Sequence, residues 1–182
     1  MAQAGISVDA IDYVMCTHLH VDHVGWNTRL DNGRWVPTFP NAKYVLSKEE
    51  YARYAPENRT GEAPPFLDIF EDSVLPIIES GQAEFVSGEH QVRDLLTIVP
   101  TPGHTPGHVI YVLEGPDRDL IFTGDSAKNR IELITGEADM TYDPAVSRAS
   151  IEMIWGHWSK KAGNLLVPGH DLPMTQIGRA HV

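Results

Sequence analysis

The sequence predicts a domain of the α/β or α+β class, in which helices cover β-sheets. Two observations lead to this prediction: short β-rich runs recur along the chain, and helical patterns alternate with them. Strands and helices that interleave in this way bury their apolar faces against one another in layers. A third observation concerns the polar clusters, each of which directly follows an apolar strand. Side chains at strand ends converge on one edge of a sheet, so these clusters are expected to form one functional site.

The predicted strands are short apolar runs that are bounded by turn residues. The first covers residues 11–17 and ends where a cluster of histidines begins. The other predicted strands are 43–47, 83–87, 96–99, 108–113, 120–123 and 165–167.

Three segments have helical patterns: 48–54, 65–80 and 144–162. The last of them has Asp143 at a plausible N-cap, Pro144 at the first helical position and Gly163 just past its end. These residue types favour helix starts and stops at those positions. The segment 58–65 predicts a loop or hinge within one domain, because too little chain lies on either side for it to link two domains.

Length and composition exclude several classes of protein. A chain of 182 residues fits a single domain, since domains commonly have roughly 100–200 residues. The net charge of −11 argues against binding to nucleic acid or to anionic lipid. The chain has no apolar run of the ~18 residues that a membrane span needs. A single cysteine cannot form an internal disulfide, so we expect a reducing, cytoplasmic location. Cys16 lies in an apolar predicted strand, so we expect it to be a small core residue.

The strongest motif is THLHVDH, which contains His18, His20, Asp22 and His23. On an extended segment, His18 and His20 point the same way because side chains alternate with a period of two. Imidazole and carboxylate groups together suit Zn²⁺, Fe or Mn, and the absence of cysteine ligands argues against a structural zinc finger.

Three further clusters supply candidate ligands. TPGHTPGH contains His104 and His108, FTGD contains Asp125, and VPGHD contains His170. With the first motif they provide enough ligands for two metal ions and a bridging carboxylate. His108 is interpreted as a packing residue or a residue that supports a ligand, because it begins a predicted strand.

The four motifs, in this order from Ile11 to about Met174, resemble the metallo-β-lactamase-fold hydrolase superfamily. The resemblance implies an α+β fold, an αββα sandwich with two divalent metal ions at the edge of its sheets. Zinc is favoured, and iron and manganese stay open. By the same resemblance His18, His20 and His104 hold the first metal, Asp22, His23 and His170 hold the second, and Asp125 bridges them.

Such a site implies hydrolysis by a metal-activated hydroxide, with Asp22 orienting the hydroxide and moving a proton to the leaving group. The chain is similar to the branch that includes acyl-homoserine lactonases, which favours a small-molecule lactone or carboxylic ester substrate. It departs from those lactonases at Lys128, where they carry a tyrosine. A glyoxalase-II-like thioesterase, an iron-dependent oxidoreductase of the same fold and an inactive fragment stay open.

Candidate substrate contacts are Trp26, Lys128 and Asn129, which follow the metal motifs. For Trp26, core packing is an equal alternative. For Lys128 and Asn129, exposure to solvent is the favoured alternative. No sequence feature indicates an oligomeric state.

Both ends of the chain differ from the family pattern. Only seventeen residues precede His18, so the first sheet is expected to lack its N-terminal strands. Residues 176–182 (QIGRAHV) resemble the translation of a common short-read sequencing adapter. The prediction is a partial domain over 1–175 and a non-native tail over 176–182, in which His181 has no function.

Overall fold

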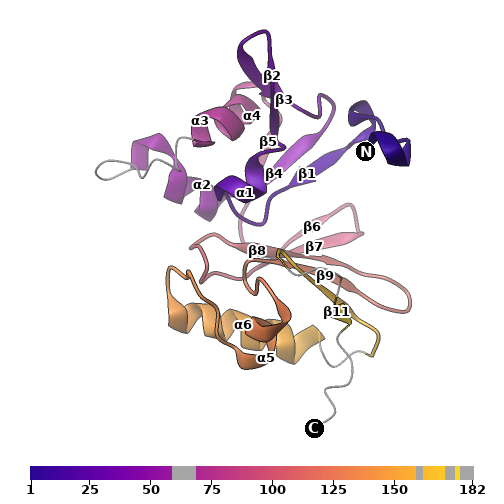
Figure 1. The fold of residues 1–182 in the computed structure, drawn as a ribbon, viewed down its shortest axis with the longest axis vertical. Coiled ribbons are helices and arrows are strands. Elements are labelled where there is room, and N and C mark those ends of the chain that lie inside the picture. The colour runs from indigo at the N-terminus through magenta and orange to yellow at the C-terminus, as the bar shows by residue number, and fades with distance from the viewer. Residues whose placement is uncertain (59–68, 159–161, 171–174, 177–182) are drawn as a thin grey trace. The chain divides into compact units, whose positions relative to one another are not determined.

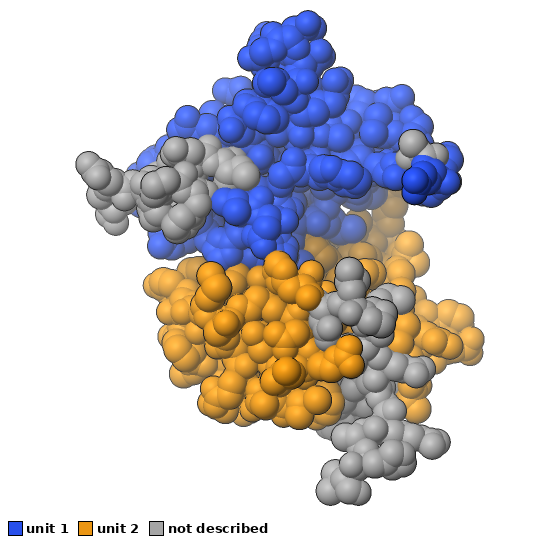
Figure 2. Space-filling model, viewed as in Figure 1, with its two compact units in different colours: residues 1–86 blue, residues 87–182 orange. Residues whose placement is uncertain are grey.

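The computed structural model describes residues 1–58, 69–158, 162–170 and 175–176. The chain divides into two compact units, unit 1 (Met1–Val86) and unit 2 (Ser87–Val182), which Figure 2 colours separately. Sheets and helices alternate along both units, as the sequence predicts. The predicted boundary at residue 175 stays a prediction.

Unit 1 is built on a three-stranded sheet in the order β1-β4-β5, with both pairs parallel. Its strands are β1 (Tyr13–Met15), β4 (Lys43–Ser47) and β5 (Ala83–Val86). The predicted first strand is therefore shorter than expected, and the other two agree closely with the prediction. Short 3-10 helices lie at Ala2–Ala4, Val8–Ala10 and Pro56–Asn58, and the α-helices are α1 (Val21–Val24), α2 (Lys48–Tyr54), α3 (Ile69–Ser73) and α4 (Leu75–Glu79).

The helix predicted over 65–80 is interrupted in the structure. Residues 65–68 lie outside the described part, and the remainder forms α3 and α4, with Val74 as the N-cap of α4. Pro76 lies in the first turn of α4. Proline lacks the N–H that continues a helix but is tolerated in a first turn, which explains the break. Both helices contribute apolar side chains to a core that includes Leu46, Tyr54 and Phe70.

A β-hairpin that the sequence analysis missed follows α1 (Figure 1). Its strands are β2 (Thr28–Asp31) and β3 (Arg34–Pro37). The turn residues Asn32 and Gly33 have φ values of 49° and 78°. Positive φ at both central positions is typical of a type I′ turn, and Asn-Gly is the strongest sequence signal for it. That dipeptide could therefore have predicted the hairpin.

Unit 2 contains a six-stranded sheet in the order β11-β10-β9-β8-β7-β6. All neighbouring pairs are antiparallel except β9 and β10, which are parallel. The strands are β6 (His90–Val92), β7 (Leu96–Pro100), β8 (Val109–Leu113), β9 (Leu120–Gly124), β10 (Leu165–Pro168) and β11 (Thr175–Gln176). The sequence predicted the four central strands within a residue or so and missed the short edge strands β6 and β11.

Two helices, α5 (Arg130–Thr135) and α6 (Pro144–Trp158), cover one face of this sheet (Figure 1). Ile110 and Ile121 from the strands pack with Leu133, Ile151 and Ile154 from the helices in one buried cluster. Asp143 caps α6 as predicted, since its carboxylate accepts hydrogen bonds from the backbone N–H groups of residues 145 and 146. Among the described residues, no helix has the combination of length and hydrophobicity that a membrane span requires.

Candidate metal centre

The first predicted ligands follow β1 in unit 1, with His18 and His20 on the loop after the strand and Asp22 and His23 in α1. His18 is buried, and its Nε2 lies 3.1 Å from Nδ1 of His20. The ring of His23 lies 4.1 Å from that of His18, measured between centroids. His23 Nε2 is also 3.5 Å from Oδ2 of Asp22. The structure therefore brings His18, His20, Asp22 and His23 together, as the motif predicts.

Buried hydrogen bonds from the rest of unit 1 hold this loop. The N–H of Leu19, between His18 and His20, donates to Oε1 of Glu50 at 3.0 Å, and Glu50 is buried on α2. After the motif, the Asn27 carbonyl accepts a hydrogen bond from the Tyr44 hydroxyl at 2.9 Å, which in turn accepts one from the N–H of Phe39 at 3.1 Å. These bonds tie the middle of the motif to α2 and the residues after it to β4.

Cys16, which precedes the motif, is a buried core residue as expected. Its thiol donates to Oδ1 of Asn27 at 3.5 Å. Burial raises the pKa of the Cys16 thiol to about 11, because the interior disfavours the thiolate. The thiol is thus not an activated nucleophile, which requires a lowered pKa.

Strand directions explain why the unit 2 ligands converge. β8 is antiparallel to both β7 and β9, so β7 and β9 run in the same direction, and β10 is parallel to β9. The carboxyl ends of these three strands therefore lie at one edge of the sheet. His104, Asp125 and His170 follow these ends within a few residues.

One oxygen of the Asp125 carboxylate lies close to both unit 2 histidines, His104 and His170. This oxygen, Oδ2, lies 3.6 Å from Nε2 of His104 and 3.3 Å from Nε2 of His170. Asp125 and His104 are buried, while the side chain of His170 is 45% exposed. One carboxylate oxygen between two imidazole nitrogens is the arrangement expected of a bridging ligand with an open side.

Two glycines in the motifs are required by close contacts. A Cβ on Gly169 would lie 2.6 Å from Oδ1 of Asp125 and 3.1 Å from the Gly124 carbonyl oxygen. A Cβ on Gly103 would lie 2.3 Å from Cα of Ser147, at the start of α6, and Gly103 has a φ of +139° that favours glycine. Gly103 therefore lets the chain before His104 approach α6, and Gly169 lets the chain before His170 approach the Asp125 carboxylate.

The residues present fit a metal site in spacing and chemistry. Two donors about 2.0–2.1 Å from a tetrahedral ion lie about 3.3 Å apart. The donor pairs inside each unit are 3.1 Å apart for His18 and His20, 3.5 Å for Asp22 and His23, and 3.3–3.6 Å for Asp125 and its histidines. All seven predicted ligands are among the His and Asp side chains of the described chain that could hold a metal ion. His90, His108 and His157 are not.

The structure decides between the alternatives for Trp26. Trp26 is 70% exposed, so the core-packing interpretation is wrong. The ring meets Phe39 edge-on, with centroids 6.4 Å apart. An exposed indole three residues after His23 is available for contact with a small molecule, and the substrate contact at Trp26 stays a prediction.

Lys128 and Asn129 have structural partners in unit 2. The Lys128 ammonium pairs with the carboxylates of Asp139 and Glu132, and its side chain is only 13% exposed, so solvent exposure was the wrong expectation. Burial raises the pKa of Glu132 despite that pairing. The Asn129 side chain caps α5 by accepting from the N–H groups of Ile131 and Glu132 at 2.9 and 3.1 Å. Both side chains therefore support the turn after Asp125, and their contact with substrate stays a prediction.

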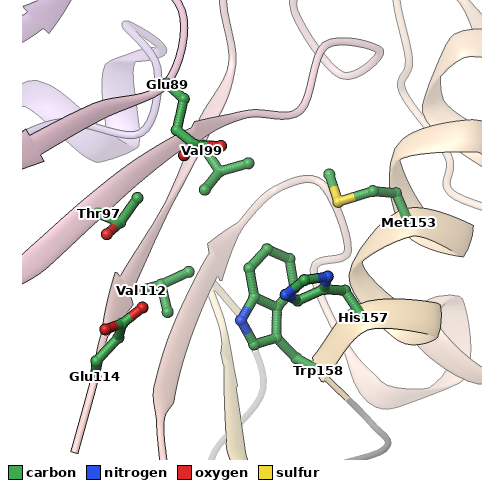
Figure 3. Close-up of a pocket in the computed structure, with 8 residues that line it drawn as sticks. All are labelled: Glu89, Thr97, Val99, Val112, Glu114, Met153, His157 and Trp158. Atoms are coloured by element: carbon green, nitrogen blue, oxygen red, sulfur yellow. The ribbon is translucent and has the colours of Figure 1, made fainter.

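A pocket of about 280 Å³ lies elsewhere in unit 2, between β7, β8 and the C-terminal end of α6 (Figure 3). Its walls include Val99, Val112, Met153 and Trp158, with Glu114 at its edge. None of the seven predicted metal ligands lines it. It is therefore not the site of the predicted metal chemistry.

The fold and these residues define a class of protein. A family model described as the metallo-beta-lactamase superfamily matches residues 1–173, and the chain belongs to that superfamily. The resemblance inferred from the four motifs is therefore confirmed.

Two curated relatives show how far the similarity extends. A probable metallo-hydrolase of Bacillus subtilis is 25% identical over 173 residues, which cover 89% of this chain and 65% of that protein. An N-acyl homoserine lactonase of Bacillus thuringiensis is 22% identical over 94% of this chain and 60% of its own length. The chain thus spans less than two thirds of these relatives.

Solved structures confirm the fold. The crystal structure of the hydrolase AbOPH, in the beta lactamase superfamily, matches with a TM-score of 0.84 at 20% identity and covers 99% of this chain and 64% of that one. A structure of the lactonase AiiA with N-decanoyl-L-homoserine at its active site matches with a TM-score of 0.69 at 22% identity, over 94% of this chain and 60% of that one.

Proposed function

We propose that the chain is the ligand-bearing part of a metal-dependent hydrolase that cleaves ester-type bonds, with a lactone or a carboxylic ester as the favoured substrate. The observation that carries the proposal is the position of Asp125 Oδ2, 3.6 Å from Nε2 of His104 and 3.3 Å from Nε2 of His170. A buried carboxylate between two imidazoles can bridge two cations, and two-metal sites cleave such bonds in many hydrolases.

The proposal assigns seven ligands to one dinuclear centre. Family membership and the order of the motifs support this assignment, as does the donor spacing inside each unit. His18, His20 and His104 would hold one ion, Asp22, His23 and His170 the other, and Asp125 would bridge them. Zinc is favoured by a donor set of five imidazoles and two carboxylates without thiolates, although iron and manganese accept the same donors.

Bound metal ions would supply a hydroxide near neutral pH and would polarise the substrate carbonyl. The side chains of this chain then have separate tasks. Asp22 has a side chain that is 51% exposed and lies 3.5 Å from His23, so it can reach both a ligand histidine and solvent. We assign to its carboxylate the orientation of the nucleophile and the transfer of a proton to the leaving oxygen. Trp26 supplies an exposed apolar surface for the substrate.

The substrate class is inferred from relatives. Similar proteins are named N-acyl homoserine lactonases, and one solved structure holds N-hexanoyl-L-homoserine as product at its catalytic metal centre. The chain differs from those lactonases at Lys128, whose ammonium is occupied by Asp139 and Glu132. The names of these relatives favour lactone and carboxylic ester bonds over thioesters, and because of the difference at Lys128 we name no particular lactone.

A substrate panel tests the proposal. The zinc-loaded protein, and separately the manganese-loaded protein, would be assayed with a lactone, a carboxylic ester, a thioester and a phosphoester. We expect turnover of the lactone or ester, and we expect His18→Ala to abolish it. His157→Ala is the matched control, because His157 is exposed on α6 and is not a candidate ligand, and it should keep full activity.

Each other outcome has a distinct meaning. Thioester turnover alone would replace the substrate class with that of a thioesterase. Oxygen consumption by an iron-loaded protein without hydrolysis would contradict hydrolase chemistry. Activity that survives in His18→Ala would remove the metal site from the reaction.

A further inference from the structure

His108 is the second histidine of TPGHTPGH and is completely buried in unit 2. Its Nε2 accepts a hydrogen bond from the backbone N–H of Asp125 at 3.1 Å. The imidazole is thus directed at the main chain of the predicted bridging residue, while the Asp125 carboxylate faces His104 and His170. His108 therefore contacts the main chain of a predicted ligand and is not itself a predicted ligand.

The accepting role of Nε2 fixes the tautomer of His108. A nitrogen that accepts an N–H hydrogen bond carries no proton, so the proton of the neutral ring is on Nδ1. Nδ1 lies 3.0 Å from the Thr101 hydroxyl and 3.0 Å from the Ser126 hydroxyl. These two hydroxyls are themselves 2.7 Å apart and are buried. The ring therefore donates on one side and accepts on the other, and it is held in one orientation.

Backbone hydrogen bonds from the loop that carries His170 also hold the turn that contains Asp125. The N–H of His170 donates to the Lys128 carbonyl at 3.0 Å, and the N–H of Gly169 donates to the Gly124 carbonyl at 3.0 Å. Residues 124–128 thus connect the loops that carry His104, Asp125 and His170. A shift of the Asp125 backbone would displace the bridging carboxylate relative to both histidines.

We propose that His108 is a positioning residue: with Thr101 and Ser126 it holds the backbone N–H of Asp125, and so presents the Asp125 carboxylate to the metal ions. The part that concerns metal ions rests on the proposed function. The part that concerns the Asp125 backbone does not, because it rests on hydrogen bonds within unit 2. An ordinary packing histidine would depend on its volume and not on which ring nitrogen is retained.

Two isosteric substitutions separate the nitrogens of His108. In His108→Gln, the side-chain carbonyl can occupy the place of Nε2 and accept from Asp125, but the donor to the hydroxyls is lost. In His108→Asn, the amide can occupy the place of Nδ1 and donate to Thr101 or Ser126, but nothing reaches the Asp125 N–H. Both variants lose volume and one hydrogen bond, so each controls for the other. Circular dichroism and the thermal midpoint would establish that both are folded.

The first measurement is amide hydrogen exchange at Asp125, by NMR, in the metal-free protein. We expect exchange in His108→Asn to be at least tenfold faster than in the wild type, and exchange in His108→Gln to stay close to the wild-type rate. The second measurement is cobalt(II) affinity, followed by the visible absorption of the bound ion. We expect about a 10–100-fold loss of affinity in His108→Asn, which is typical when a supporting residue is removed, and a smaller loss in His108→Gln.

The outcomes distinguish this proposal from the proposed function. If the Asp125 amide is equally protected in both variants, or equally exposed in both, His108 acts by packing and the proposal is overturned. If Asp125 exchange follows the expected order but the wild type binds no cobalt, the positioning of the backbone stands and the metal function fails. If cobalt binds and is weakened equally in both variants, the presentation of the carboxylate by Nε2 is contradicted.

Discussion

Gly103→Ala is a small substitution that we expect to lower the stability of unit 2 strongly. Gly103 precedes the predicted ligand His104, and its carbonyl accepts a hydrogen bond from the N–H of Asp143, the N-cap of α6. A Cβ at this position would lie 2.3 Å from Cα and 2.5 Å from N of Ser147. Both are backbone atoms of a fifteen-residue helix, so neither can move without moving the helix.

Two costs combine in this substitution. The φ of +139° is a conformation that alanine rarely adopts, and forcing it costs about 1–3 kcal/mol. Insertion of a methyl group into close-packed structure costs about another 1–3 kcal/mol. The free energy of unfolding should therefore fall by about 4 kcal/mol, a large part of the roughly 5–15 kcal/mol of an ordinary domain. The loop that carries His104 should also be displaced.

Urea denaturation followed by circular dichroism measures the first effect, and zinc titration of the folded fraction measures the second. Gly156→Ala is the matched control, since Gly156 lies in α6 and a Cβ there meets no atom within 4 Å. It should stabilise the protein by up to about 1 kcal/mol through helix propensity. If Gly103→Ala unfolds at the same free energy as the wild type, within about 0.5 kcal/mol, the close contact with α6 is refuted.

Three further changes have defined outcomes. Tyr44→Phe removes the acceptor of the buried Phe39 N–H and should lower the free energy of unfolding by about 1–3 kcal/mol in urea denaturation; an unchanged value would contradict that hydrogen bond. The pKa of Cys16 is raised to about 11, so the unfolded chain loses this proton at lower pH, and stability should fall as pH rises from about 9 to 11. Denaturation in Cys16→Ala should show a smaller fall, and an equal one would mean that other groups cause it. Gly169→Ala should weaken zinc binding in a calorimetric titration, because its Cβ would lie 2.6 Å from Oδ1 of Asp125; unchanged affinity would mean that the carboxylate has room to move.

The sequence predicted the central strands well because their signals are local. β4, β8 and β9 are apolar runs whose ends coincide with polar or turn residues, so their bounds follow from composition alone. The short strands β6 and β11 have no such pattern, since an edge strand is defined by its partner. The β2–β3 hairpin was missed although Asn32-Gly33 is a local signal.

The candidate ligands were predictable because the chemistry limits their residue types. Each follows the end of a strand, on a loop or, for Asp22 and His23, in the short helix α1, where imidazole or carboxylate has little reason to recur unless it binds something. What the sequence could not show is how the ligands are held. The bond from the Leu19 N–H to Glu50 spans 31 residues, and the bond from the Asp125 N–H to His108 spans 17. Such contacts depend on the fold, as does the ion pair that occupies Lys128.

The most direct test of the proposed dinuclear centre is the metal content of the protein after loading with zinc and exhaustive dialysis, measured by mass spectrometry against protein concentration. We expect two zinc ions per chain. We expect fewer than two in Asp125→Asn, because an amide is a poor bridge between cations, and two in His157→Ala. A wild-type chain that retains no zinc, or an Asp125→Asn variant that retains both ions, would refute the dinuclear centre.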